Sequence, residues 1–75
     1  MSWLEDVRDA QAASARASAE FLDQFLEHCA QAELVAESIG DHQSVDQIRV
    51  LLPLARMARD QQARLADELA GPVPA

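Results

Sequence analysis

The chain has 75 residues, of which 15 are alanine and none is lysine, asparagine, threonine or tyrosine. This length allows one domain, and the scarcity of β-branched and aromatic residues favours helices and excludes an all-β fold. Thirteen acidic residues against six arginines give a net charge of -7, which would repel a phosphate backbone, so we expect no direct binding of nucleic acid. No apolar run approaches the roughly 18 residues of a membrane span, and the N-terminus lacks a signal-peptide pattern, so we expect a soluble, cytoplasmic chain that does not bind membranes.

The first predicted helix covers about residues 3–39, because no glycine or proline interrupts the chain before Gly40. Ser2 and Glu5 form a capping-box pattern at its start. The Ser2 hydroxyl would accept a hydrogen bond from the backbone N–H of Glu5, and the Glu5 carboxylate would accept one from the backbone N–H of Ser2. Gly40 is expected to take a left-handed conformation just beyond the helix end, within a turn over residues 40–44.

The second predicted helix covers about residues 45–70, with Ser44 as the N-cap of another capping-box pattern. Pro53 lies inside it, where proline removes one backbone hydrogen bond and clashes with the preceding turn, so we expect a kink between Arg49 and Pro53. The alternative is that Pro53 begins a third helix. Residues 71–75 contain one glycine and two prolines and are expected to form a flexible tail.

A connection of about five residues favours an antiparallel hairpin of the two helices, in a single domain that spans residues 1–75. If the turn centres near His42, residues whose numbers add up to about 84 face each other. Large side chains then lie opposite small ones, including the alanines and serines of residues 10–19, as a close-packed interface requires. The predicted core consists of Phe21, Leu22, Phe25, Leu26, Ile48, Leu51, Leu52 and Leu65.

The chain carries more apolar side chains than one contact between two helices can bury. Small chains seldom reach stability with such a core, and pairing of two hairpins is a common remedy. We therefore predict an all-α homodimer in which two hairpins form a four-helix bundle of the coiled-coil type. The candidate protein-interaction residues are Trp3, Leu4 and Val7 on the first helix and Val50, Leu54 and Met57, which form a separate stripe on the second.

Trp3 begins a segment of the first helix that should extend beyond the end of the shorter second helix. Tryptophan is the residue type most often found at binding hot spots. One interpretation is that Trp3 packs on Val73 of its own tail or on the second copy of the chain. The other is that it docks onto a different protein, whose identity the sequence does not indicate.

Charge is divided unevenly along the chain. Residues 1–46 contain ten acids and two arginines, for -8, and residues 47–75 contain three acids and four arginines, for +1. Antiparallel packing would bring these opposite charges together across the hairpin, where exposed pairs favour correct pairing more than they add stability. The predicted partners are Arg49, Arg56, Arg59 and Arg64 on one side and Glu27, Glu33 and Glu37 on the other.

The sequence contains no recognisable motif for catalysis or for binding a cofactor. A hairpin of this size offers no evident cleft, and its two glycines make no phosphate-binding loop, so we expect no enzyme and no cofactor. Cys29 is the only cysteine, and the adjacent His28 points about 100° away from it on a helix, so we expect Cys29 to be a small core or interface residue.

Acidic residues also raise the question of a metal site. Glu20, Asp23 and Glu27 share a helix face, but the Glu-x-x-His motif of carboxylate-bridged bundles is absent, and a solvated face explains them. His42, between the acids of the turn, has the setting of a cap rather than of a zinc ligand. We therefore expect no metal-ligating residues.

Together these observations predict a non-enzymatic protein-interaction or assembly subunit that acts as a helical hairpin. Two alternatives stay open. The acidic first helix would suit an inhibitor that mimics nucleic acid, for example against a restriction enzyme, because carboxylates can occupy the place of phosphates. Less favoured is a bundle that holds metal ions with carboxylates.

Overall fold

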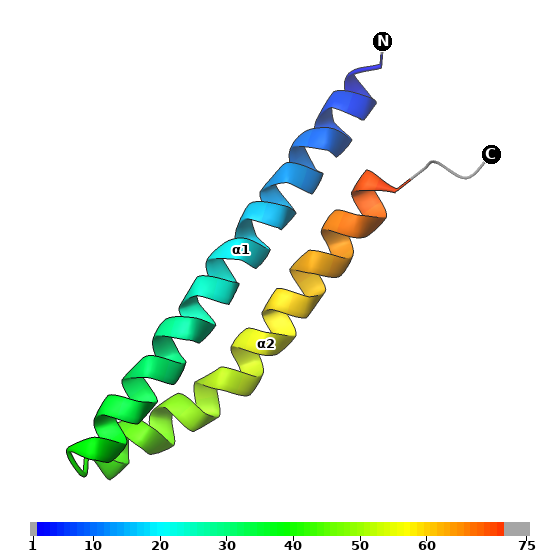
Figure 1. The fold of residues 1–75 in the computed structure, drawn as a ribbon. Helices are drawn as coiled ribbons and strands as arrows, with labels where there is room; N and C mark the ends of the chain where they lie inside the picture. The colour runs from blue at the N-terminus through cyan, green and yellow to red at the C-terminus, as the bar shows by residue number, and fades with distance from the viewer. Residues whose placement is uncertain (1, 72–75) are drawn as a thin grey trace.

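A computed structural model describes residues 2–71, and within this range the chain forms two long helices and no strand. Helix α1 covers Trp3–Ser38 and helix α2 covers His42–Ala70, and the two run antiparallel and side by side (Figure 1). The molecule is a rod of 58 × 16 × 13 Å. The predicted all-helical hairpin is confirmed, whereas most of the predicted flexible tail, residues 72–75, lies outside the described residues.

Helix α1 begins at the expected residue but with a different hydrogen bond. The Ser2 hydroxyl accepts from the backbone N–H of Leu4 at 3.2 Å. The predicted donor, Glu5, instead gives its N–H to the Ser2 backbone carbonyl at 3.1 Å. Glu5 and Asp6 still place negative charge in the first turn, where the helix dipole favours it.

Gly40 ends helix α1, as predicted, with a φ of +74°. The N–H of Asp41 donates to the carbonyl of Ala36 at 2.9 Å, and the N–H of Gly40 donates to the carbonyl of Glu37 at 3.2 Å. These two bonds are the Schellman pattern, which satisfies carbonyls that the helix end would otherwise leave without donors. A residue with a Cβ would be strained at this φ, so glycine is required for the tight reversal.

Helix α2 begins three residues earlier than predicted, because Asp41 rather than Ser44 is its N-cap. The Asp41 carboxylate accepts from the Ser44 backbone N–H at 3.2 Å and from the Ser44 hydroxyl at 2.6 Å. These two bonds, the side-chain bond first, lower the pKa of Asp41. Both Asp41 and Ser44 are residue types that cap helices well. Asp41, which directly follows Gly40, becomes the N-cap of α2.

Helix α2 then continues through Pro53 to Ala70 without interruption. The alternative of a third helix that begins at Pro53 is therefore wrong.

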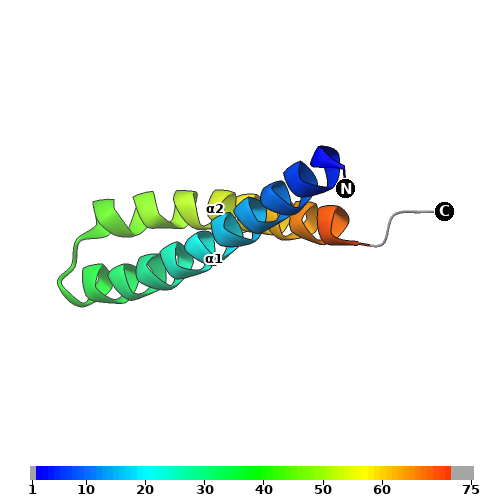
Figure 2. The same ribbon diagram turned by 90° about the horizontal axis from the view of Figure 1, so that it is seen from above.

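The contact between the helices follows a seven-residue repeat. The residues that α1 turns toward α2 are spaced alternately three and four apart, which is the pattern of a coiled coil. We call this contact the seam. Viewed at right angles to Figure 1, the two helices cross in projection, and toward the turn α2 lies above α1 (Figure 2). The seam residues are Arg8, Ala12, Ala15, Ala19, Leu22, Leu26, Cys29, Glu33 and Ala36 on α1, and Val45, Ile48, Leu52, Ala55, Arg59, Gln62, Ala66 and Leu69 on α2.

Small side chains dominate the buried part of this seam. Six of the seven buried residues in the described range are alanines, and the seventh is Val45. The predicted core is right for its half-buried members in the seam, Leu22, Leu26, Ile48 and Leu52, and wrong for Phe21, Phe25, Leu51 and Leu65, which are exposed in the single chain. The sequence prediction chose the largest apolar side chains, whereas close approach of the two helices selects the smallest.

Candidate interaction surface

The seam divides the rest of the hairpin into two faces with different chemistry. On each helix, the residue that follows a seam residue lies on one side of the contact, and the residue that precedes it lies on the other. In an antiparallel pair, the preceding residues of both helices lie on the same side. The side that carries the residues directly after seam residues, which we call following residues, is the charged face. The side that carries the residues directly before seam residues, which we call preceding residues, is the uncharged face.

The charged face holds the ion pairs of the hairpin. Arg49 contacts Glu33 and Glu37, both at 2.9 Å, which confirms that part of the predicted pairing. Arg59 contacts Asp23 at 3.3 Å and Asp60 at 3.0 Å. The hydrogen bond to Glu33 raises the pKa of Arg49 most, and that to Asp60 does the same for Arg59. These pairs are exposed, so solvent and salt screen them and they add little to stability.

Three of the predicted charge partners take no part in this network. Among the ion pairs within residues 2–71, none involves Glu27, Arg56 or Arg64. Asp23 and Asp60 instead supply the carboxylates for Arg59. The prediction that arginines of α2 pair with acids of α1 is thus right. The choice of residues is right for Arg49 with Glu33 and Glu37, and for Arg59 although not for its acidic partner.

Arg8 fixes the far end of helix α2, a role that the sequence analysis missed. Its guanidinium donates to the backbone carbonyl of Leu69 at 2.9 Å and to that of Glu68 at 3.1 Å. A cation that caps the last carbonyls of a helix is favoured by the helix dipole. The seven-residue repeat could have revealed it, because Arg8 lies seven residues before Ala15 in the seam. Residues 3–7 extend beyond this point as an overhang.

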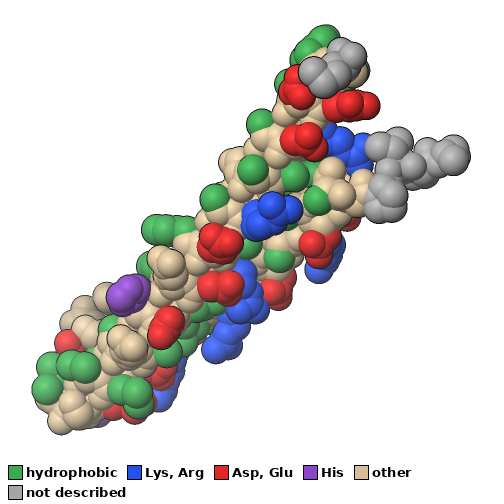
Figure 3. Space-filling view, turned by 45° about the horizontal axis from the view of Figure 1, so that its top comes forward, with side chains coloured by type: hydrophobic (Ala, Val, Ile, Leu, Met, Phe, Trp, Pro, Cys, Tyr) green, Lys and Arg blue, Asp and Glu red, His purple; other side chains and the backbone are tan. Residues whose placement is uncertain are grey.

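The uncharged face carries most of the large exposed apolar side chains. Figure 3 shows hydrophobic side chains along the left edge of the molecule, apart from the acidic and basic groups along its middle and right. On α1, none of the preceding residues from Leu4 to Ile39 is an acid or an arginine, whereas six of the nine following residues from Asp9 to Glu37 are. On α2, the one charged preceding residue between Ser44 and Leu69 is Glu68. The large apolar members of the uncharged face are Leu4, Val7, Phe21, Phe25, Val35, Ile39, Leu51, Leu54 and Leu65.

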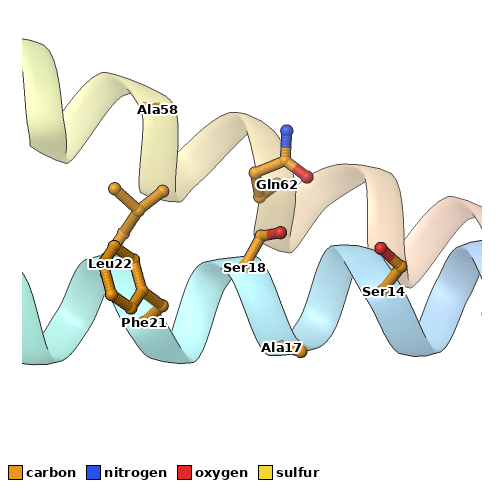
Figure 4. A pocket seen from close by; sticks show the side chains of 7 residues that line it. All are labelled: Ser14, Ala17, Ser18, Phe21, Leu22, Ala58 and Gln62. Carbon is orange, nitrogen blue, oxygen red and sulfur yellow. The ribbon is translucent and has the colours of Figure 1, made fainter.

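Several hollows interrupt the uncharged face, among them one lined by Gln11, Ser14 and Leu65 and two larger ones. The first of the larger two lies between α1 and α2 near mid-length, with Phe21 at one end, Ser14 at the other, and Ser18 between them below Gln62 (Figure 4). We call it the serine hollow. The second lies beside the turn, and we call it the turn groove. It is lined by side chains that include Ala32, Val35, Ile39, Ile48 and Leu51.

The six predicted interaction residues are all exposed in the single chain, from 41% for Val7 to 70% for Trp3. Leu4, Val7 and Leu54 lie on the uncharged face. Trp3, Val50 and Met57 lie next to it, on the sides of the helices that point away from the seam. The most exposed of the residues wrongly assigned to the core is Phe21, at 66%, and it lies near the middle of the uncharged face. The structure therefore brings it into the candidate surface.

The described part of the chain offers little for chemistry at a metal. Within residues 2–71, no three histidine, cysteine or acidic side chains come close enough together to hold a metal ion. Asp41, beside His42, is engaged as the cap of α2. Cys29 is a half-buried free thiol in the seam.

Comparisons with models of protein families, with curated proteins and with solved structures found no match to this chain. Neither helix contains, within the described residues, a segment that is long and apolar enough to cross a membrane. Evidence about function therefore comes from the geometry of the two faces.

Proposed function

We propose that this chain is a non-enzymatic assembly subunit that pairs with a second copy of itself through the uncharged face, as a four-helix bundle. In such a bundle the large apolar residues of two hairpins would form a shared core, and the charged faces would point outward. We place the subunit in the cytoplasm, where its lone thiol, Cys29, would stay reduced.

The observation that carries the proposal is the amount of surface that the hairpin exposes. A compact chain of 8.2 kDa is expected to expose about 4,500 Å², whereas this one exposes 5758 Å². The excess of roughly 1,200 Å² exceeds the roughly 800 Å² that each partner contributes to a standard protein interface. Its radius of gyration of 17.1 Å likewise exceeds the roughly 11 Å of a compact chain of this length.

Two finer features belong to the same proposal. The kink expected between Arg49 and Pro53 would let α2 curve around a partner helix and keep contact over its length. Trp3, beside the uncharged face at the overhang, would pack at the edge of the dimer or capture a different protein. With Trp3→Ala, loss of the dimer or a lower melting temperature supports the first role, and an intact dimer that no longer captures a partner supports the second.

Sedimentation equilibrium of the full chain between 1 and 100 µM (about the range of useful concentrations for a Kd near a micromolar) tests the proposal. The expected mass is twice 8.2 kDa. A mass of one chain throughout this range would refute self-association. Metal analysis of the same sample tests the carboxylate metal bundle, which stoichiometric iron, zinc or copper would favour.

A second candidate function rests on the charged face. The following residues of α1 include Glu20, Asp23 and Glu27 in one row, and the only arginine in that set is Arg16. A row of carboxylates on a rigid helix could occupy the phosphate-binding surface of a nucleic-acid enzyme. Capture of a basic nuclease that weakens steeply as salt rises from 50 to 200 mM, by about tenfold or more, would support this acidic inhibitor.

A further inference from the structure

We propose that the two copies pair with their turns at opposite ends, so that α1 of one copy lies antiparallel on α1 of the other and Phe21 meets Phe21 at the two-fold axis. This inference rests on the self-association proposed above. It assigns an occupant to the serine hollow and to the turn groove, and that occupant is a named segment of the second copy.

A two-fold dimer of hairpins through one face has two arrangements. If the turns lie at the same end, α1 faces α2 of the second copy at equal height along the bundle. If the turns lie at opposite ends, α1 faces α1 and α2 faces α2. The two arrangements bring different residues of the uncharged face together, so the residues themselves discriminate between them.

With turns at opposite ends, the uncharged face of α1 pairs with itself about its own midpoint. Residues whose numbers add up to 42 or 43 then meet, and large or apolar residues find suitable partners at each level. The overhang contributes two of these contacts and the middle of the helix three. The pairs are Leu4 with Ile39, Val7 with Val35, Ser18 with Phe25, Ser14 with His28, and Phe21 with Phe21.

With turns at the same end, residues whose numbers add up to 82 or 83 would meet, as they do across the seam, where Arg59 pairs with Asp23. Val35 would then face Gln47 of the second copy, and Ile39 would face Ser44. The apolar overhang would face nothing within the described residues, because α2 ends at Ala70. This arrangement does place Phe25 on Ala58 and Leu65 on Ser18, but it also sets Phe21 on Gln61.

With turns at opposite ends, α2 pairs with itself at sums of 122 or 123, where Leu65 meets Ala58 and Leu54 meets Glu68. The arrangement with turns at the same end is the poorer match because it leaves more large apolar side chains, and the whole overhang, on polar groups or on nothing.

The hollows fit the first arrangement. Phe25 of the second copy would enter the serine hollow beside Ser18, where small side chains leave room for a ring. Leu4 and Val7 of the second copy would enter the turn groove against Ile39 and Val35. Each hollow occurs twice in the dimer and is filled twice, which closes the assembly at two copies.

Charge does not oppose this contact, although α1 is the more acidic helix. The preceding residues of α1, between Leu4 and Ile39, carry no acid and no arginine, and the only titratable group among them is His28, which would face Ser14. The carboxylates of α1, such as Asp23 and Glu37, lie on the charged face with the arginines of α2. Two acidic helices can therefore approach through their uncharged sides.

Distances between nitroxide spin labels test the arrangement in the full chain. Cys29→Ala provides the cysteine-free parent, and single labels are attached at Ala10→Cys, Gln24→Cys and Gln31→Cys, which are exposed and lie on the outer side of α1. Turns at opposite ends predict that each residue of displacement from Phe21 adds about 3 Å of axial separation, twice the helical rise. The label pair at Gln31 should thus be about 21 Å farther apart along the axis than that at Gln24, and the pair at Ala10 about 24 Å farther.

The possible results distinguish the arrangement with turns at opposite ends from self-association itself. Three different distances, shortest at Gln24, support opposite turns. Equal distances at all three sites in a protein with the mass of two chains overturn the inference and leave self-association standing. A mass of one chain with no dipolar coupling between labels refutes both. Circular dichroism of each labelled variant, compared with the parent, verifies that the helices are intact.

Discussion

Replacement of Phe21 by alanine should separate association from folding, because its ring is exposed in the single hairpin. The side chain is 66% exposed, and a phenylalanine has an accessible surface of about 200 Å², so pairing can cover about 130 Å² of it. At about 25 cal/mol per Å², this area is worth about 3 kcal/mol per copy. We expect Phe21→Ala to raise the dimer Kd at least a hundredfold.

Leu34 provides the matched control. It is 67% exposed, almost the same as Phe21, but it follows the seam residue Glu33 and therefore lies on the charged face. Leu34→Ala should change the dimer Kd by less than about threefold, as is usual for a surface site away from an interface. Sedimentation equilibrium measures both constants. Equal weakening by the two variants, or no effect of Phe21→Ala, would refute the assignment of the uncharged face to the interface.

Three further predictions concern the hairpin itself. Gly40→Ala should lower the free energy of unfolding by about 1 kcal/mol in chemical denaturation, because φ is +74° and a Cβ would meet nothing within 4 Å that could offset the strain; an unchanged midpoint would contradict this. Arg8→Ala should speed amide exchange in the last turn of α2, next to Leu69, and leave its first turns protected, whereas uniform exchange along α2 would argue against the cap. Because folding lowers the pKa of Asp41, the cap stabilises above the ordinary value of 3.8 and this contribution is lost as pH falls through the folded pKa. The melting temperature should thus fall less on acidification in Asp41→Asn than in the wild type, and parallel curves would count against it.

The helices and their reversal were predictable because local signals determine them. Ser2 and Gly40 act at the predicted ends of α1, and Arg49 forms the pairs that opposite charge implied. The start of α2 was missed because two good cap residues, Asp41 and Ser44, lie within one turn of each other. Only the geometry after Gly40 decides between them.

The core was harder to predict because the size of an apolar side chain and its position in the seven-residue repeat select different residues. Phe21 and Leu65 have the larger apolar surfaces, but Ala12, Ala15 and Ala19 hold the repeated spacing of three and four that marks the seam. The same repeat contains Arg8. Spacing, followed over the whole helix before size was considered, would have identified both the seam and the two faces.

The alanines of the seam have a consequence for how much of this protein can exist in a folded form. A buried alanine removes little apolar surface from water, so most of the energy that could stabilise the hairpin is held in side chains that only a second copy would cover. The proposed pairing would then add to the stability of the single hairpin, and the fraction folded would rise with total concentration. Freshly made chains at low abundance would be open to proteases, and accumulation would protect them. The amount of protein in the cell would therefore depend on a threshold rate of synthesis.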